Sequence, residues 1–262
     1  MRTIVLTRPQ PIHDGVTLVL RAHGLRVLAL PTLHVTAHVD ADFEQQLLSH
    51  WASYQGVMLV SQHAVNFAAQ RLQALGLLWR EQVWAAAVGR TTADAAHHQW
   101  PKANLIFPAA HESQDSEGLW LALQRTQADL MGQRILIVRA QVGRDAFLNQ
   151  LRAAGALVDV WSCYRREALM WTEAQCHDFR RALQGTGVVL SFTSQEGILA
   201  LLDNLVALSE GEARSVFEQP VLTLHPSIAE CARSHGFNHV HMAPAKDAAE
   251  HLQRLAYATH RH

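Results

Sequence analysis

Cysteine is scarce in this chain and is not arranged for bridging or for metal binding. The three cysteines, Cys163, Cys176 and Cys231, are odd in number, and none belongs to a CxxC pair. Disulfide-stapled domains carry an even set of cysteines, and structural zinc sites use closely paired ones. The sequence therefore predicts neither a disulfide framework nor a zinc site, and it favours the reducing cytoplasm as the location.

Long apolar runs and an excess of one charge are missing as well. No stretch of about 18 apolar residues occurs, which argues against a membrane-spanning helix. The first residues, MRTIVLTRPQ, enter a strand-like run and lack the pattern of a signal peptide. Lys and Arg number 22 against 23 Asp and Glu, which gives a net charge of −1. We therefore expect no membrane partner and no nucleic-acid partner, since nucleic-acid binders carry a basic stripe.

The common cofactor and nucleophile motifs are also absent. No strand-like run is followed by GxGxxG, and neither the phosphate-binding GxxxxGK[ST] nor the hydrolase GxSxG occurs. Histidine is abundant at 17 residues, but its densest groups, His97-His98 and His235, His239 and His241, lack HExxH or Cys-paired spacing. The sequence predicts a protein without a metal or an organic cofactor.

An internal repeat is the strongest positive feature. Residues 3–30 match residues 134–161 without a gap, pairing Arg8 with Arg139 and Gly24 with Gly155. A second pair of similar segments starts at Val57 and at Val188. Repeats this far apart indicate two similar domains rather than a solenoid. The repeat alone suggests a boundary near residue 131, and two such domains usually hold a ligand in the cleft between them.

Short apolar runs alternate with amphipathic segments, which predicts two α/β domains, each a parallel sheet of about five strands with helices on both faces. Ser61 is expected to cap a helix, Thr91 or Thr92 to cap the next one, and Gly24 to end a helix. The segment 32–42 is mixed and polar and is predicted to be a linker. The expected strands are 4–7, 25–31, 57–60, 83–89, 104–108, 135–139, 157–161, 188–192, 220–224 and 239–242.

Hydroxyls, arginines and helix starts follow these strands, where ligands gather in parallel sheets. Such groups suit anions. The candidates are Thr7-Arg8, Ser61, Gly89 to Thr92, Arg139, Gly143-Arg144, Thr193-Ser194 and His225 to Ser227. Ser61 and Ser194 are equally explained as helix caps, and the arginines as solvated surface residues. The matching positions of Arg8 and Arg139 in the two copies favour a function for that pair.

Tyr164 is one of three tyrosines and follows the run LVDVW in the segment SCYRRE. A phenol at a strand end beside two arginines can give or accept a proton. A packing tyrosine in an interdomain connection explains the same position, and composition alone favours that interpretation.

Several segments, taken in order over the full length, resemble the uroporphyrinogen-III synthase family. They are VLTRP (5–9), LVSQHAV (59–65), AVGRTTA (87–93), SEGLW (116–120), residues 143–167, VVLSFTSQEG (188–197) and residues 224–237. The resemblance implies two domains joined by a two-stranded connection, with residues 1–36 and 168–262 in one and 37–167 in the other.

The resemblance also implies the reaction. Hydroxymethylbilane, a linear tetrapyrrole, is cyclised to uroporphyrinogen III with loss of water and inversion of ring D, without a cofactor. Tyr164 matches the tyrosine proposed to assist departure of the hydroxyl. Substrate-binding residues are expected at Arg8, Ser61, Thr92, Arg139, Ser194 and Ser227. A monomer that contacts the preceding pathway enzyme only transiently is expected.

This chain departs from the family at Ala140 and Gln141, which replace a glycine-rich turn, and at His225 and Ile228, where glycine and threonine are common. These departures put the anion site of the second copy in doubt. The alternative function is a non-catalytic, two-lobed protein that binds a small molecule or a tetrapyrrole.

Overall fold

The computed structural model describes residues 1–9, 15–127, 129–143 and 145–258. Within it the chain divides into two compact units, Met1–His34 with Glu167–His262, and Val35–Arg166. The chain passes from one unit to the other within β3 (Leu33–Ala37) and again within β8 (Leu157–Ala168). These two strands are neighbours in one sheet.

The unit formed by both ends of the chain, unit 1, contains a five-stranded sheet in the order β11-β10-β9-β1-β2, whose neighbouring strands are parallel. Its strands are β1 (Thr3–Leu6), β2 (Val27–Ala29), β9 (Val188–Phe192), β10 (Val221–Thr223) and β11 (Val240–Met242). Its helices are α1 (Gly15–Ala22), α7 (Glu173–Gln184), α8 (Gln195–Leu205), α9 (Glu210–Phe217), α10 (Pro226–Ser234), the 3₁₀ turn η2 (Ala245–Asp247) and α11 (Ala248–Tyr257).

The central unit, unit 2, contains a six-stranded sheet in the order β3-β8-β7-β4-β5-β6, and the pairings from β8 to β6 are parallel. Its remaining strands are β4 (Gly56–Leu59), β5 (Trp84–Ala87), β6 (Asn104–Ile106) and β7 (Arg134–Ala140). Its helices are α2 (Ala41–His50), the 3₁₀ turn η1 (Trp51–Ser53), α3 (Gln62–Ala74), α4 (Arg90–Gln99), α5 (Ser116–Thr126) and α6 (Ala146–Ala153).

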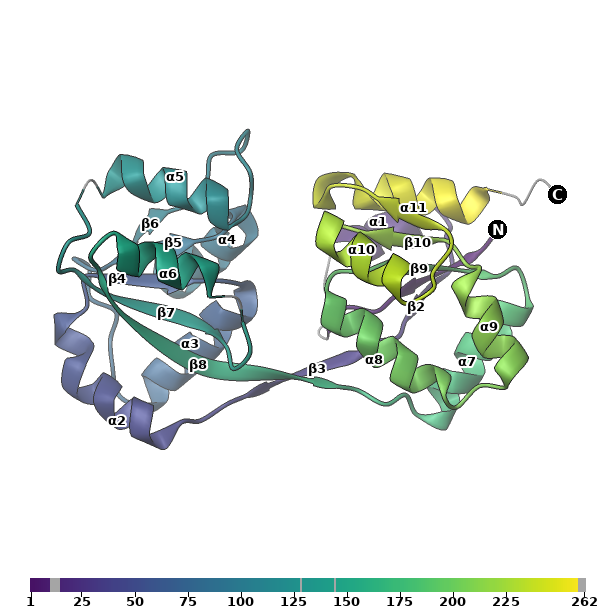
Figure 1. Cartoon of the computed structure of the whole chain (residues 1–262), viewed down its shortest axis with the longest axis horizontal. Helices are drawn as coiled ribbons and strands as arrows, with labels where there is room; N and C mark the ends of the chain where they lie inside the picture. The colour runs from purple at the N-terminus through teal and green to yellow at the C-terminus, as the bar shows by residue number, and fades with distance from the viewer. Residues whose placement is uncertain (10–14, 128, 144, 259–262) are drawn as a thin grey trace. The chain divides into compact units, whose positions relative to one another are not determined.

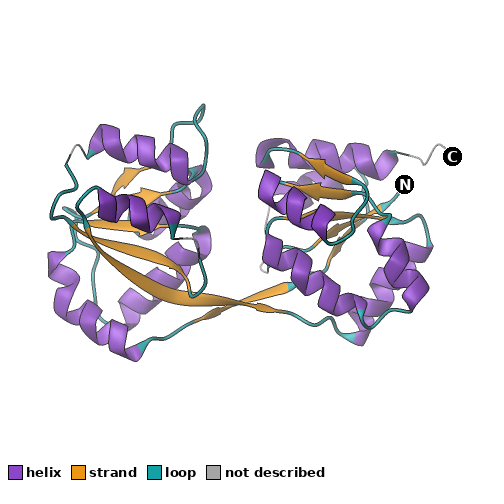
Figure 2. Cartoon of the chain, viewed as in Figure 1, coloured by secondary structure: helices purple, strands orange, loops and turns teal. Residues whose placement is uncertain are grey.

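The central strands β1, β9, β10, β4 and β5 are buried on both faces, which is why they are almost entirely apolar. In unit 2, Val57 and Leu59 pack with α2 and α3, while Met58 between them packs with α5 and α6. In unit 1, Val5 packs with the α7–α10 side and Ile4 with α1 and α11. Figures 1 and 2 show these helices flanking the strands within each unit. The predicted fold class is confirmed.

Three local predictions were wrong. The supposed linker 32–42 holds β3 and the start of α2, because its alternating residues Leu33 to Ala37 find a partner in β8. The His38 amide donates to the Cys163 carbonyl at 3.0 Å, just beyond β3. Eleven strands therefore occur in the described residues rather than ten. Neither Thr91 nor Thr92 caps α4, which begins at Arg90 after the N-cap Gly89.

The expected caps elsewhere are confirmed. Ser61 accepts from the Ala64 amide and Ser194 from the Gly197 amide, each with extended backbone at the N-cap. Gly24 has a φ of 72°, the left-handed conformation that ends a helix.

Candidate functional site

Tyr164 and Ser61 are brought together at the carboxyl end of the unit 2 sheet. Ser61 follows β4 and starts α3, whereas Tyr164 lies in β8. Their hydroxyl oxygens are 2.9 Å apart, and either can be the donor. Because the Ser61 oxygen also accepts from the Ala64 amide at 3.1 Å, the cap and the contact with the phenol share one atom. Capping and a role at the site are therefore compatible for Ser61.

Tyr164 is placed differently from the sequence prediction. It does not follow a strand ending at Trp161 but lies inside the 12-residue β8. The pairing with β7 shifts between Arg139 and Ala140, so that Arg139 faces Ser162 and Ala140 faces Tyr164. Such a bulge redirects the following side chain. The phenol is 3% exposed and sits at the edge of the core, with its hydroxyl on the cap of α3.

Two more side chains of α3 lie against Tyr164. The Phe67 ring stacks on it with centroids 5.7 Å apart and an interplanar angle of 10°. The His63 ring is tilted by 44° with centroids 6.0 Å apart. Burial lowers the pKa of His63, and the Arg166 guanidinium lowers it further. Sequence reasoning missed both residues, although their four-residue spacing places them on the same face of the helix that Ser61 starts.

Thr92 lies at the carboxyl end of the same sheet, in the first turn of α4, and is 6% exposed. The first amide of α4, that of Arg90, donates to Gln114 Oε1 at 3.0 Å. A neighbouring side chain thus replaces the missing N-cap side chain of Gly89. Only a small part of the Thr92 surface is exposed, so a substrate could contact this residue only there.

Arg139 is held by an ion pair within unit 2. Its Nη1 lies 2.7 Å from Asp145 Oδ1, and the arginine side chain is 16% exposed against 59% for the aspartate. A substrate carboxylate would have to compete with Asp145 at this site. Arg144, named with Gly143 in the sequence analysis, lies outside the described residues.

The other candidates belong to unit 1. Arg8 lies two residues beyond β1 and is half-buried. Ser194 caps α8. Ser227 is in the first turn of α10, where the His225 ring nitrogen Nδ1 accepts from the Ser227 amide at 3.1 Å and lies 2.8 Å from its hydroxyl. A histidine therefore occupies part of the hydrogen-bonding capacity of this helix start.

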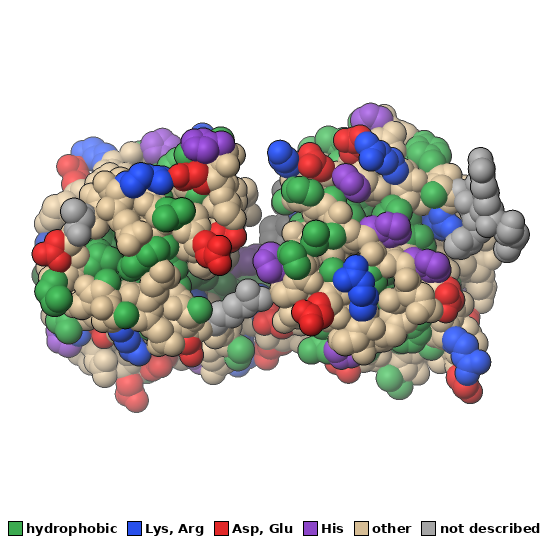
Figure 3. Space-filling view, turned by 45° about the horizontal axis from the view of Figure 1, so that its top comes forward, with side chains coloured by type: hydrophobic (Ala, Val, Ile, Leu, Met, Phe, Trp, Pro, Cys, Tyr) green, Lys and Arg blue, Asp and Glu red, His purple; other side chains and the backbone are tan. Residues whose placement is uncertain are grey.

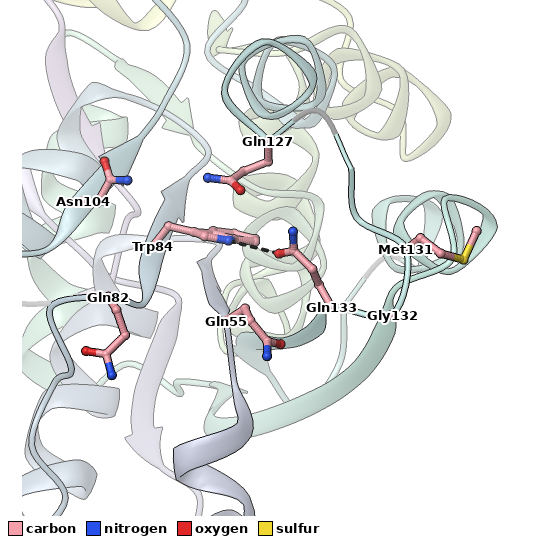
Figure 4. Close-up of a pocket in the computed structure, with 8 residues that line it drawn as sticks. All are labelled: Gln55, Gln82, Trp84, Asn104, Gln127, Met131, Gly132 and Gln133. Carbon is pink, nitrogen blue, oxygen red and sulfur yellow. Dashed lines mark hydrogen bonds between the residues drawn. The ribbon is translucent and has the colours of Figure 1, made fainter.

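A pocket of unit 2 lies at the amino ends of β5 and β6 and not beside Tyr164. It encloses about 450 Å³ and is lined by Gln55, Gln82, Trp84, Asn104, Gln127, Met131, Gly132 and Gln133. Figure 4 shows its amide side chains around the Trp84 ring, whose Nε1 donates to Gln133 Oε1 at 3.3 Å. None of these side chains titrates near neutral pH, so we do not assign proton transfer to this pocket.

Charge is distributed without a dominant sign. On the face drawn in Figure 3, basic and acidic side chains are interspersed within each unit. In the part of the chain that the structure describes, no three His, Cys, Asp or Glu side chains form a group that could hold a metal ion. No helix among those same residues is long and apolar enough to cross a membrane.

Solved structures share the fold over nearly the whole chain. Uroporphyrinogen-III synthetase from Helicobacter pylori superposes with a TM-score of 0.61 at 16% identity, covering 97% of this chain and 99% of that one. A mutant uroporphyrinogen III synthase from Thermus thermophilus gives a TM-score of 0.59 at 14% identity, covering 97% of each chain. At these identities the likeness concerns the fold alone.

Sequence relatives identify the family. The uroporphyrinogen-III synthase of Salmonella typhimurium is 33% identical over 173 residues, which are 66% of this chain and 68% of that protein. The one from Proteus mirabilis is 28% identical over 182 residues, 66% of this chain and 89% of that protein. A model of the family described as uroporphyrinogen-III synthase HemD matches residues 16–253. This chain therefore belongs to the uroporphyrinogen-III synthase family, the cyclising lyases of haem biosynthesis.

Proposed function

We propose that this chain converts hydroxymethylbilane into uroporphyrinogen III with Tyr164 as the proton donor to the leaving hydroxyl and Ser61 as its partner. The contact between the two hydroxyls, 2.9 Å long, carries the proposal. A phenol held in place by a hydroxyl partner can act as a general acid, which accelerates reactions by roughly 10²- to 10⁴-fold.

The cap of α3 explains how the pair has a proton to give. Ser61 Oγ already accepts the Ala64 amide, so the serine can still donate its own proton to the phenol oxygen. Of the two hydroxyl protons, only one lies between the two oxygens. We propose that the other passes to the substrate hydroxyl, which leaves as water and creates an electrophilic methylene on the terminal ring opposite ring D.

Besides proton transfer, the enzyme must bind and orient the substrate, and orientation can supply a large share of the rate acceleration. The substrate carries eight carboxylates, and we propose that Arg8, Thr92, Arg139, Ser194 and Ser227 bind them. Hydroxyls at helix starts suit this task, because amide donors and the helix dipole favour negative charge there, and the two arginines near the strand ends add positive charge. We further propose that the two units are the two domains predicted from the sequence, with boundaries near residues 36 and 167.

The decisive assay supplies freshly prepared hydroxymethylbilane and separates the uroporphyrin isomers after oxidation. We expect isomer III, which has the inverted ring D, at a rate proportional to the protein added. Isomer I alone, at the rate of the protein-free control, would contradict the proposal. Tight binding of the tetrapyrrole without turnover would instead support the non-catalytic alternative.

Three expectations from the sequence stay predictions. They are the absence of a cofactor, a cytoplasmic location, and a monomer that meets the preceding enzyme only transiently. Light scattering coupled to size-exclusion chromatography tests whether the protein is a monomer. Activity assays after chelation and desalting test whether it works without a cofactor.

A further inference from the structure

The proposed reaction moves protons in both directions. Departure of the substrate hydroxyl consumes one proton, and restoration of the last pyrrole ring releases one from a ring carbon. Only water is lost overall, so the enzyme must recover the proton that it gave. If Tyr164 donates, it is left as a phenolate at a position only 3% exposed, where a charge is costly.

His63 is placed to take part in this recovery. It lies two residues after Ser61 in the first turn of α3, and its ring contacts Tyr164 with centroids 6.0 Å apart. Phe67 follows one turn later and stacks on the same phenol. Ala64, Val65 and Phe67 of α3 pack into the core cluster that includes Trp161 and Tyr164 of β8, which holds this start of α3 against the tyrosine.

The surroundings favour the neutral form of the imidazole. Burial lowers the pKa of His63 and the positive charge of Arg166 on β8 lowers it further, so both effects favour the uncharged ring. The Tyr164 phenol also faces the ring, and the neighbouring Phe67 carries no charge. A neutral imidazole has one nitrogen that accepts a proton and one that donates.

We propose that His63 is the second proton-transfer residue of this enzyme: it accepts the proton that ring D releases and returns it to the Tyr164 phenolate. The C–H bond of the ring carbon breaks, and its electron pair restores the pyrrole. The proton forms an N–H bond on the imidazole and then passes to the phenolate oxygen, directly or through one water. Both residues end in their starting states. The inference rests on the proposed role of Tyr164.

The test compares His63→Asn with Phe67→Leu, a matched variant on the same helix face that also loses a ring against Tyr164. In the wild type, kcat should fall as the pH drops through the pKa of His63, because the protonated ring cannot accept. His63→Asn should lower kcat at neutral pH by roughly 10²-fold and abolish that acidic limb. KM and the thermal midpoint should barely change, and added imidazole should restore part of the rate.

Phe67→Leu should retain the acidic limb and should not respond to imidazole, whatever its effect on rate or stability. An unchanged pH profile in His63→Asn, or a loss of rate equal to that of Phe67→Leu without rescue, would overturn the inference. If Tyr164→Phe is slow while His63→Asn keeps the wild-type rate, the role of Tyr164 survives and that of His63 fails. A wild-type protein that forms no isomer III removes the basis of both.

Discussion

The two units are built on one scaffold but differ at its functional edge. Read from β2, the strands of unit 1 lie in the order β2-β1-β9-β10-β11, and those of unit 2 in the order β8-β7-β4-β5-β6. The repeat in the sequence maps β1-α1-β2 onto β7-α6-β8, and Ser194 at the start of α8 onto Ser61 at the start of α3. Equivalent strands and helices thus occupy the same positions within each unit.

The order in which the chain visits these positions differs. In unit 1 the β1-α1-β2 segment comes first and its neighbour β9 joins much later, whereas in unit 2 the matching β7-α6-β8 segment comes last. This permutation explains why the repeat alone suggested a boundary near residue 131. Sequence similarity identifies equivalent β-α-β segments, but it does not show which segments join the same sheet.

At the carboxyl edge the equivalent residues have different chemistry. Continued three residues beyond the matched segments, the same register places Leu33 opposite Tyr164, and a Cβ added at Gly197 of α8 would lie 4.0 Å from Leu33 Cδ1. Unit 1 therefore has the serine cap but an aliphatic side chain in the place of the phenol. The scaffold is therefore duplicated, while the proton transfer that we propose belongs to unit 2.

The largest expected effect tests that assignment directly. Tyr164→Phe keeps the ring that stacks on Phe67 and removes only the hydroxyl bonded to Ser61. We expect kcat to fall by about 10²-fold, at the lower end for one acid–base group, with little change in the thermal midpoint. Initial rates on hydroxymethylbilane measure it. A wild-type rate would mean that the hydroxyl has no chemical role, and unfolding would show that Tyr164 is a packing residue.

A second comparison concerns the amino ends of the strands. In unit 2, Asp159 accepts from the Tyr54 hydroxyl at 2.7 Å and from Arg134 Nε at 2.8 Å. The repeat places Leu28 and Thr3 at the positions of Asp159 and Arg134 in unit 1. Burial, followed by the hydrogen bond to Asp159, raises the pKa of the Tyr54 phenol.

The variant Asp159→Leu introduces the leucine that unit 1 has at this position. It should lower the free energy of unfolding by about 2 kcal/mol, because the hydroxyl of Tyr54, a residue only 3% exposed, loses its hydrogen-bond acceptor. Urea unfolding followed by tryptophan fluorescence suits this measurement, since six of the seven tryptophans lie in unit 2 and only Trp171 lies in unit 1. The double variant Tyr54→Phe with Asp159→Leu should be more stable than the single one. The reverse order would show that Asp159 acts mainly through Arg134.

The two serine caps separate stability from catalysis. Ser61→Ala and Ser194→Ala should each destabilise the protein by about 1 kcal/mol, because each removes the acceptor for an amide in the first turn of a helix. Only Ser61→Ala also removes the partner of Tyr164, so only it should lower kcat beyond any change in KM. Equal kinetic losses in the two variants would contradict the difference between the units.

Much of this scaffold can be predicted from the sequence, because buried parallel strands are short apolar runs and serine is a strong N-cap. Val57 to Val60 and Val188 to Phe192 show the first signal, and Ser61 and Ser194 the second. The strand β3 could not be predicted in this way. Its residues 33–37 are mixed in polarity, and they form a strand because β8 extends beyond Trp161 to pair with them.

The site itself depends on contacts between distant segments. Ser61 and Tyr164 can each be named from the sequence, but not as a pair. Their hydrogen bond depends on the bulge between β7 and β8, and no local sequence pattern predicts that bulge. His63 was overlooked because a lone histidine after a cap has no motif. Its spacing from Phe67 becomes informative only once Tyr164 is known to lie against that helix face.

The smallest expected effect concerns the helix starts at Gly89 and His225, which occupy equivalent places after β5 and β10. His225 caps α10 through the Ser227 amide, whereas the N-cap Gly89 of α4 has no side chain and Gln114 accepts from the first amide instead. Replacing a capping side chain by glycine usually costs only a few tenths of a kcal/mol. His225→Gly should therefore weaken unit 1 by about 0.3 kcal/mol, which is too little for bulk unfolding to resolve.

Hydrogen exchange resolves this difference locally. The Ser227 amide donates to the His225 ring, so in His225→Gly it should exchange faster, while amides in the middle of α10 keep their rates. His225→Asn serves as the control, because asparagine is itself a good N-cap and should preserve the slow exchange. Faster exchange in both variants would mean that the imidazole protects this amide by covering it rather than by accepting its proton. In that case the histidine would only restrict the access of water to the helix start. The two units would then differ in solvent access at this position rather than in helix capping.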